Sequence, residues 1–228
     1  TGTNTNIGIT GKGSGKVKLG DGNLLFPDAD GSANQYIKTD GSANLAFATL
    51  PTGGSLVYLG EVTASASATV ELESLISSTY NNYMIQVMTV HPASSNTTLM
   101  MRTSTNNGSA YRSTGDYYYH TTNLESSSAS YVATAAYNGT SILISPPVGI
   151  NAATSNMSGY FMLTNVYATH RLVIHGTVTG EGDGSQAHGV GHVGGGSHYA
   201  EAVNALQFFM SSGNMDTGTF RIYGIAES

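Results

Sequence analysis

Tyrosine and histidine side chains gather in one short stretch of this sequence, between residues 111 and 120. The group consists of Tyr111, Tyr117, Tyr118, Tyr119 and His120, with Arg112 and Asp116 beside them. A tyrosine ring offers an apolar surface with a polar tip, and it loses little conformational entropy on binding. Alternation along a strand places Tyr117 and Tyr119 on one face and Tyr118 on the other. This group is therefore our first candidate binding surface, and packing between sheets or subunits is the alternative.

Histidines and glycines dominate a second stretch, from residue 181 to residue 198. Its histidines are His188, His192 and His198, and the glycines around them exclude a helix. We expect these histidines to contact a ligand from a loop. An ordinary connecting loop is one alternative, and a metal site to which several chains each contribute a histidine is another, since imidazole suits iron, nickel and zinc. We assign no metal and no cofactor to the chain.

The usual signatures of catalysis are missing from the sequence. Residues 11–17 lack the spacing of a phosphate-binding loop, and neither Gly-x-Ser-x-Gly nor His-Glu-x-x-His occurs. Glu71 and Glu73 would place two carboxylates on one face of a strand, which a glycosidase requires. The solvated face of a sheet gives the same pattern, because Val70 and Leu72 would supply its buried face. We expect no enzyme, and a polysaccharide-cleaving enzyme is the alternative.

The composition excludes several classes of protein. Only 10% of the residues are charged, against about 25% in typical proteins, and the net charge of -6 is too small for a disordered chain of this length. The 8 Lys and Arg residues are spread along the sequence, so they cannot follow a nucleic-acid backbone. No apolar run approaches the roughly 18 residues of a membrane span, so we expect no membrane insertion. Without cysteine, disulfides and thiol chemistry are excluded.

A repeat marks the first fifty residues. The pentapeptide Asp-Gly-Ser-Ala-Asn occurs at residues 30–34 and again at residues 40–44, and each copy precedes a short extended stretch. Each stretch carries only one or two apolar side chains, so a single copy of this segment cannot bury a core. Other chains must supply the missing surface, and an intertwined homo-oligomer is the physical solution.

A second region begins near residue 56, after a Pro-Gly-rich linker at residues 51–55. Short runs with strand character are separated there by Gly, Asn and Ser, which predicts an antiparallel sandwich. The predicted strands are residues 56–62, 68–73, 83–91, 97–105, 117–122, 131–137, 141–145, 160–168, 172–178, 206–210 and 220–225.

Alternation within two of these strands predicts which side chains are buried. Phe220 and Ile222 share the face of the last strand that we assign to the core. The strand at residues 83–90 is apolar on both faces, which predicts an interior position in the sheet. In this strand Met84, Met88 and Val90 share one face, and Ile85 and Val87 share the other.

Short motifs at both ends of the chain match one family of proteins. At the N-terminal end they are Gly20-Asp21-Gly22, Phe26-Pro27, residues 30–35, residues 38–41 and Asn44-Leu45. At the C-terminal end they are residues 211–214, 218–220 and 223–225. The first set resembles the shaft segment of bacteriophage tail fibres, and the second resembles the closing strands of phage fibre domains. Fibres of that family are generally homotrimers whose C-terminal head contacts the host surface.

Residue patterns and resemblance together predict an all-β protein. Residues 1–50 would form a short intertwined trimeric β stalk, residues 51–55 a linker, and residues 56–228 an antiparallel, jelly-roll-like β-sandwich head. The requirement for a shared stalk follows from the sequence, whereas the number three is what the resemblance implies.

The resemblance also implies a function. The chain would be a surface appendage of a virion whose head attaches to a host glycan or protein. Its receptor contacts would be Tyr111, Tyr117, Tyr118, Tyr119, His120, His188, His192 and His198. Its partners would include further copies of itself and other virion proteins. The alternative is a purely structural fibre or capsid decoration protein whose head caps the trimer.

Overall fold

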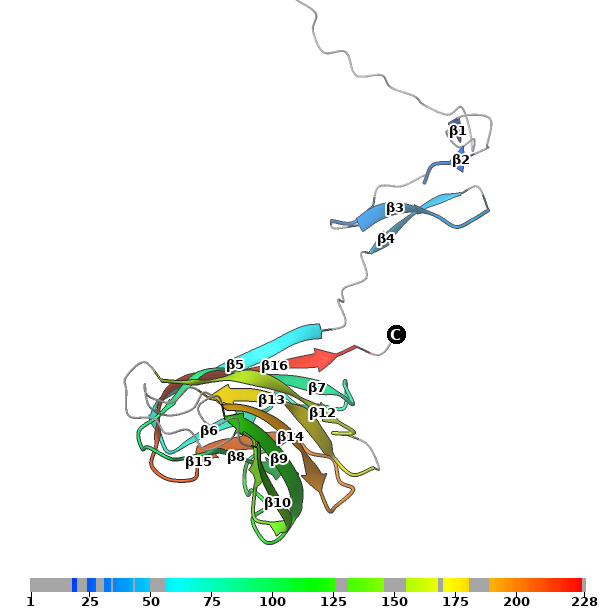
Figure 1. The fold of residues 1–228 in the computed structure, drawn as a ribbon. Helices are drawn as coiled ribbons and strands as arrows, with labels where there is room; N and C mark the ends of the chain where they lie inside the picture. Colours follow the sequence, from blue (N-terminus) through cyan, green and yellow to red (C-terminus); the bar gives the residue numbers. More distant parts are fainter. Residues whose placement is uncertain are drawn as a thin grey trace, which may run out of the picture. The chain divides into compact units, whose positions relative to one another are not determined.

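The structure, a computed structural model, divides the chain into two compact units, Thr1–Gly53 and Gly54–Ser228. It describes residues 18–19, 24–27, 31–33, 35–42, 44–49, 56–125, 131–145, 155–167, 170–180 and 189–226. Every regular element in this part of the chain is a strand (Figure 1), and no helix capable of crossing a membrane occurs in it. The boundary between the units falls within the predicted linker at residues 51–55.

The first unit contains two small hairpins. Strand β1 (Lys18–Leu19) pairs with β2 (Leu24–Leu25), and β3 (Gln35–Thr39) pairs with β4 (Leu45–Thr49). The second copy of the pentapeptide forms the β3–β4 turn. Gly41 has a φ of 79°, which favours glycine, and Asp40 Oδ1 accepts hydrogen bonds from the backbone nitrogens of Ser42 and Asn44 at 2.7 and 3.1 Å.

The second unit is an antiparallel sandwich of an eight-stranded and a four-stranded sheet, with β6, β8 and β15 lying below β5 and β16 in Figure 1. The larger sheet has the order β10-β9-β14-β13-β12-β7-β16-β5. Its strands are β5 (Leu56–Ser67), β7 (Tyr83–Pro92), β9 (Tyr117–Glu125), β10 (Tyr131–Gly139), β12 (Met157–Thr164), β13 (Val173–Gly180), β14 (Gly189–Ser197) and β16 (Met215–Ile225). The smaller sheet has the order β11-β8-β15-β6 and consists of β6 (Thr69–Glu73), β8 (Leu99–Ser104), β11 (Ile142–Leu143) and β15 (Ala205–Met210).

The predicted all-β class and antiparallel sandwich are confirmed. Each of the predicted strands overlaps a strand of the structure. The prediction for the second unit missed β14, which lies inside the eight-stranded sheet between β13 and β9, and β1 and β2 of the first unit were not predicted either. The glycines of β14 were interpreted as a loop.

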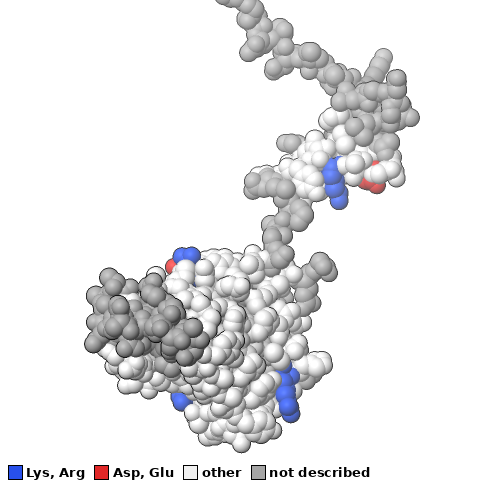
Figure 2. Space-filling model, viewed as in Figure 1, with Lys and Arg blue, Asp and Glu red and all other residues white. Residues whose placement is uncertain are grey.

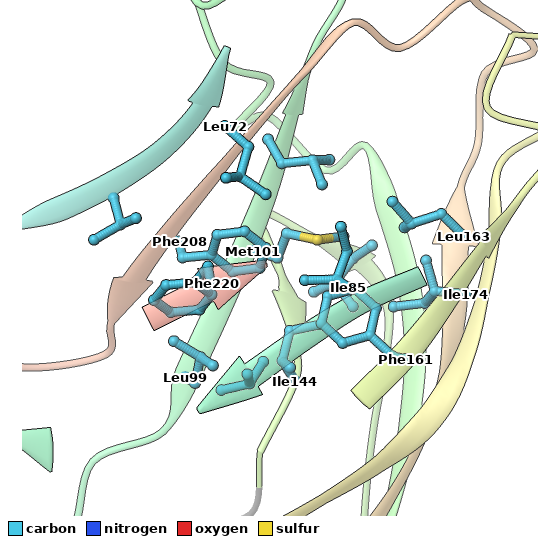
Figure 3. Packing of buried hydrophobic residues seen from close by; sticks show 14 of the residues in the cluster. Leu72, Ile85, Leu99, Met101, Ile144, Phe161, Leu163, Ile174, Phe208 and Phe220 are labelled. Carbon is cyan, nitrogen blue, oxygen red and sulfur yellow. The ribbon is translucent and has the colours of Figure 1, made fainter. Parts of the chain in front are cut away.

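Aromatic and aliphatic side chains from both sheets form one core (Figure 3). The rings of Phe208, from the smaller sheet, and Phe220, from the larger one, stack with their centroids 4.5 Å apart. Phe161 of β12 adds a third ring, 6.2 Å from Phe208. The predicted burial of Phe220 and Ile222 is confirmed, since neither side chain is exposed to solvent.

Strand β7 lies between β12 and β16, so its predicted interior position is confirmed. The prediction for Val90 was wrong. Its side chain is buried in the core with Ile85 and Val87 instead of sharing the face of Met88. The reason is an irregularity at Thr89, whose φ of 47° and the accompanying register shift break the alternation.

Candidate functional site

The face of the eight-stranded sheet that is turned away from the smaller sheet is called the outer face below. Register aligns a row of side chains across this face. Tyr160 of β12 is opposite Thr177 of β13, Thr177 is opposite His192 of β14, and His192 is opposite Thr122 of β9. Residues directly opposite in adjacent strands are close enough for their side chains to interact. The row therefore combines an aromatic ring, an imidazole and hydroxyls.

A shallow depression lies along this row, which we call the Tyr160 depression. Its volume is about 440 Å³, and its lining residues are Tyr160, Met162, His175, Gly176, Thr177, His192 and Val193. The side chains of Tyr160, His175 and His192 are exposed, Tyr160 to 54%. The Nδ1 atom of His192 lies 3.1 Å from the Thr177 hydroxyl, so a hydrogen bond fixes the orientation of this imidazole.

Three histidines surround Gly194 of β14. Register places Gly194 between His175 of β13 and His120 of β9, and His192 lies two residues away on the same face. A Cβ on Gly194 would lie 2.6 Å from the ring of His120, so only a glycine leaves room for this ring. Within the ranges that the structure describes, no three His, Asp or Glu side chains are placed to hold a metal ion.

An aromatic cluster lies beyond Gly194. The ring of His198 is 5.4 Å from that of Tyr118 and 4.9 Å from that of Tyr137, between centroids. The Nε2 atom of His198 also makes a hydrogen bond with the carbonyl oxygen of Tyr137. Tyr118 lies over Gly196, where a Cβ would be 2.8 Å from the phenol oxygen. Glycines of β14 thus allow aromatic rings of β9 to lie flat on the sheet.

This part of the outer face is uncharged. Strands β10, β12, β13 and β14 contain no Lys, Arg, Asp or Glu, and residues 117–124 of β9 contain none either. The outer face carries an ion pair farther along the sheet, between Arg221 of β16 and Glu61 of β5. In the view of Figure 2, most of the visible surface that is not grey consists of uncharged residues.

The structure brings four of the predicted contacts together on the outer face: Tyr118, His120, His192 and His198. The predicted alternation of Tyr117 and Tyr119 against Tyr118 is confirmed. Tyr119 is half-buried and packs against the core, and Tyr111 lies elsewhere, beside Glu73. His188 lies outside the described residues.

The prediction of Tyr117 as a surface contact was wrong. This side chain has no exposed area and belongs to the core of the sandwich. Its hydroxyl accepts a hydrogen bond from the backbone nitrogen of Thr103 at 2.8 Å. A buried ring with a satisfied hydroxyl stabilises the fold and offers nothing to a ligand.

The interpretation of the histidine-glycine stretch as a loop was also wrong for residues 189–197. These residues form β14, which pairs along its whole length with β13 on one side and β9 on the other. Glycine is required in this strand because atoms of neighbouring residues lie where a Cβ atom would stand. A Cβ on Gly196 would lie 2.1 Å from the carbonyl oxygen of Leu172. Residues 181–188 lie outside the described ranges.

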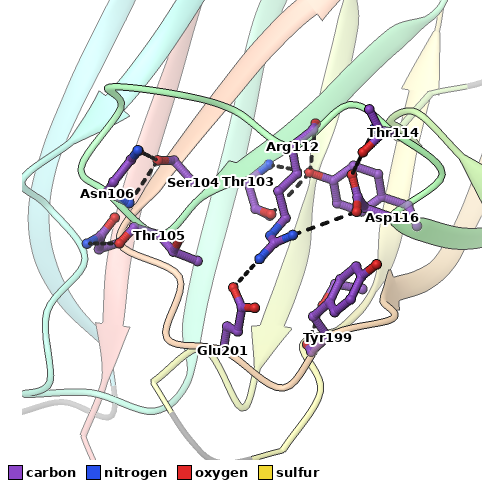
Figure 4. Close-up of polar contacts among 12 residues, drawn as sticks. Thr103, Ser104, Thr105, Asn106, Arg112, Thr114, Asp116, Tyr199 and Glu201 are labelled. Carbon is purple, nitrogen blue, oxygen red and sulfur yellow. Dashed lines mark hydrogen bonds and ion pairs between the residues drawn. The ribbon is translucent and has the colours of Figure 1, made fainter.

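Arg112 and Asp116, noted beside the tyrosines in the sequence, belong to a polar cluster (Figure 4). Arg112 forms ion pairs with Glu201 and, at 3.7 Å, with Asp116, and its guanidinium carbon lies 4.6 Å from the centre of the Tyr199 ring. Partial burial opposes the charge, but the bond to Glu201 and the two carboxylates raise the pKa of Arg112. Its charge is already balanced, so this cluster fixes the loop before β9 rather than offering a free cation.

Glu71 and Glu73 lie on one face of β6, with Val70 and Leu72 buried behind them as predicted. Glu71 Oε1 accepts a hydrogen bond from Gln207 Nε2 at 2.8 Å, and Glu73 accepts one from the Tyr111 hydroxyl at 3.4 Å. Burial, together with the two carboxylate charges, raises the pKa of Tyr111. The phenol therefore stays protonated and donates to Glu73.

Three residues of the outer face were missed by the sequence analysis: Tyr137, Tyr160 and His175. Tyr160 and His175 lie in predicted strands, on the face opposite the buried residues, and Tyr137 lies at the end of the predicted strand at residues 131–137. Alternation could have assigned them to solvent. Only the pairing of β12, β13 and β14 shows that they lie beside His192 and His198.

Comparison with protein-family models and with curated proteins gives no indication of what this arrangement binds. The chain matches no protein-family model, and no curated protein matches it either. The function must therefore be argued from the geometry.

Proposed function

We propose that this chain is an attachment protein of the virion-fibre type. In this proposal several copies share the first unit, and the second unit binds a glycan of a host cell surface through the Tyr160 depression. The observation that carries the proposal is the contrast between the two units. The second unit has a large buried core, whereas residues 26–27, 31–33, 35–42 and 44–49 of the first unit are all half-buried or exposed.

The first unit requires partners for its stability. Tyr36 is 39% exposed and Ile37 45% exposed in β3, and the described residues of β4 are all half-buried or exposed. A two-stranded hairpin without a covered apolar face is marginal in water. Further copies of the same segment would cover these side chains. Three copies, as in the fibres that the sequence resembles, form the proposed assembly.

The chemistry of the Tyr160 depression favours a neutral, hydroxyl-rich ligand. An exposed tyrosine ring can stack on the apolar face of a sugar. Imidazoles of His175 and His192 and the hydroxyl of Thr177 can exchange hydrogen bonds with sugar hydroxyls. Strands β12, β13 and β14, which line the depression, contain no charged residue that could recognise an acidic or basic group. A volume of about 440 Å³ is within the usual range for small-ligand sites.

Several shallow sites on one assembly would act together. A single open site of this kind binds weakly, because it covers little of the ligand. When copies share one stalk, the second and third contacts become intramolecular, and the overall avidity can rise by about 10² to 10⁴ over one site. Attachment to a repeating surface polysaccharide follows from this arrangement.

Binding of the full chain to an array of bacterial surface polysaccharides, some uncharged and some acidic, tests the proposal. We expect binding to at least one uncharged polysaccharide and a loss of apparent affinity of about tenfold or more on Tyr160→Ala, a change of about 1.4 kcal/mol. Tyr58→Ala is the matched control, because Tyr58 is also 54% exposed and lies on β5 at the far edge of the sheet. Equal binding by wild type and Tyr160→Ala would contradict the proposal that the glycan binds in the Tyr160 depression.

A further inference from the structure

The row of polar side chains that lines the Tyr160 depression continues on both sides of it. Beyond Tyr160 the next residue in register is Gln86 of β7, and beyond His192 it is Thr122 of β9. Gln86 and Thr122 are half-buried residues of the outer face. The row therefore crosses five adjacent strands, in the order Thr122, His192, Thr177, Tyr160 and Gln86.

Each end of this row is marked by a change of residue type. Next to Gln86 lies Arg221 of β16, whose charge is balanced by an ion pair with Glu61 of β5. Next to Thr122 lies Ala133 of β10, whose methyl group makes no hydrogen bond. Thr122 and Gln86 are thus the last uncharged side chains of the row that can make hydrogen bonds with a ligand.

Gln86 offers hydrogen-bond donors beside the Tyr160 ring. Its Oε1 atom accepts a hydrogen bond from the hydroxyl of Tyr223 at 3.5 Å, and Tyr223 lies on the opposite side of β7 from Tyr160. Within the described part of the chain, the Nε2 atom of Gln86 has no hydrogen-bond partner. An amide nitrogen carries two donors, so Gln86 can donate to a sugar hydroxyl next to Tyr160.

A second, less polar row runs beside the first. His175 of β13, Met162 of β12 and Met84 of β7 are opposite one another in register, each two residues from a member of the polar row. Both methionines are half-buried, and their thioethers adapt readily to an apolar partner. A sugar unit has hydroxyls at its edges and C–H groups on its faces. One polar row beside one mostly apolar row therefore suits a chain of sugars that lies across the strands.

We infer that the site extends from Thr122 to Gln86 and binds a stretch of several units of an uncharged polysaccharide, laid across the strands. This inference rests on the proposed function and adds to it the length of the ligand and two contacts. Neighbouring strands are about 4.8 Å apart, so the four steps from β9 to β7 span about 19 Å, the length of about four sugar units in an extended chain. A single terminal sugar would occupy only part of this row.

NMR titration of residues 56–228 tests the inference. This part can be studied alone, because all residues of the hydrophobic core lie within the second unit. The probes are fragments of roughly one to eight sugar units, which bracket the length of the row, made by partial acid hydrolysis of an uncharged polysaccharide that the full chain binds. We expect the affinity to rise by about tenfold or more between about two and four units and to change little beyond that length.

Gln86→Ala and Thr122→Val remove the two end contacts. Each should weaken binding of a four-unit fragment by about three- to tenfold, the usual contribution of a hydrogen bond. A two-unit fragment held at Tyr160 cannot reach both residues, so at most one of the two variants should weaken its binding. Thr63→Val is the matched control, because Thr63 lies on the outer face of β5, beyond the ion pair of Arg221. Circular dichroism should report the same sheet content in all variants.

Two results would overturn the inference and leave the proposed function intact. One is an affinity that Tyr160→Ala reduces but that stops rising at one or two sugar units. The other is a four-unit fragment that binds Gln86→Ala and Thr122→Val as tightly as wild type. Failure of every uncharged polysaccharide to bind, or binding that Tyr160→Ala does not affect, would refute the proposed function and the inference with it.

Discussion

The hydroxyl of Tyr117 in β9 lies 2.8 Å from the backbone nitrogen of Thr103 in β8, so one side chain of the larger sheet hydrogen-bonds the backbone of the smaller one. The Thr103 hydroxyl lies 3.1 Å from the same phenol oxygen. Both groups are buried, and neither could find water if the bond were lost. Tyr117 thus joins the two layers of the sandwich beside the strand that carries Tyr118 and His120.

Replacing this tyrosine should destabilise the second unit. Tyr117→Phe keeps the ring but leaves the buried nitrogen of Thr103 without its acceptor, which costs about 1 to 3 kcal/mol of unfolding free energy. Urea denaturation of residues 56–228 measures the loss. Tyr58→Phe, at an exposed position, should change stability by less than about 0.5 kcal/mol. Equal stability of the two variants would show that the bond contributes nothing.

The same tyrosine should make the fold sensitive to alkali. Burial raises the pKa of Tyr117 above the ordinary value of 10.0, although the bonds from Thr103 act in the opposite direction. The folded protein therefore holds the phenol proton more tightly than the unfolded chain does. This contribution is fully present below pH 10.0 and is lost as the pH rises through the higher pKa of the folded state. Urea midpoints of wild type should fall more steeply above pH 10.0 than those of Tyr117→Phe, and parallel curves would contradict the account.

The stability of the turn at Asp40 should fall at low pH, whereas the contribution of Tyr117 is lost at high pH. The side-chain amide of Asn44, together with the backbone nitrogens of Ser42 and Asn44, lowers the pKa of Asp40 below the ordinary value of 3.8. Its stabilisation of the turn is present above pH 3.8 and is lost as the pH falls through the lower pKa of the folded state. Carboxyl titration by NMR in the full chain should place Asp40 below 3.8, and Asn44→Ala should raise its pKa. An unchanged pKa in that variant would exclude the amide as the main cause.

Glycines within the sheet should differ sharply in their tolerance of a methyl group. A Cβ on Gly176 would lie 2.4 Å from the Cα atom of Phe161, which is backbone and cannot move aside. A Cβ on Gly60 would lie 3.0 Å from Cδ2 of Leu75, the end of a flexible side chain. We expect Gly176→Ala to cost about 3 kcal/mol or more and Gly60→Ala about 1 kcal/mol or less. Thermal unfolding of both variants provides the comparison, and similar melting temperatures would disagree with the geometry.

Much of the fold could be predicted from the sequence because hydrophobic alternation is a local property. The strand at residues 220–225 and the interior position of residues 83–91 followed from it directly. Strand β14 could not be predicted in this way, since its glycines carry no alternation. Glycine is needed at these positions because residues far away in the sequence pack closely against them, such as His120 beside Gly194 and Leu172 beside Gly196. Val90 was misassigned because nothing in the sequence indicates the irregularity at Thr89.

Only part of the candidate site could be predicted, because the site also depends on contacts between residues far apart in the sequence. Residue type identified Tyr118, His120, His192 and His198 as chemically suited to binding, but their convergence depends on the pairing of β9 with β14. Tyr117 differs from Tyr118 only in the face to which it points. The buried face of β9 is the one that packs against the smaller sheet. The sequence around the tyrosines does not indicate which face that is.

Light scattering coupled to size exclusion, on the full chain and on residues 56–228 over a range of concentrations, tests the central claim most directly. A shared first unit predicts that the full chain remains an oligomer on dilution, whereas residues 56–228, which lack the first unit, dissociate to monomers. A full chain that is monomeric at every concentration would contradict the proposal of a multivalent attachment protein.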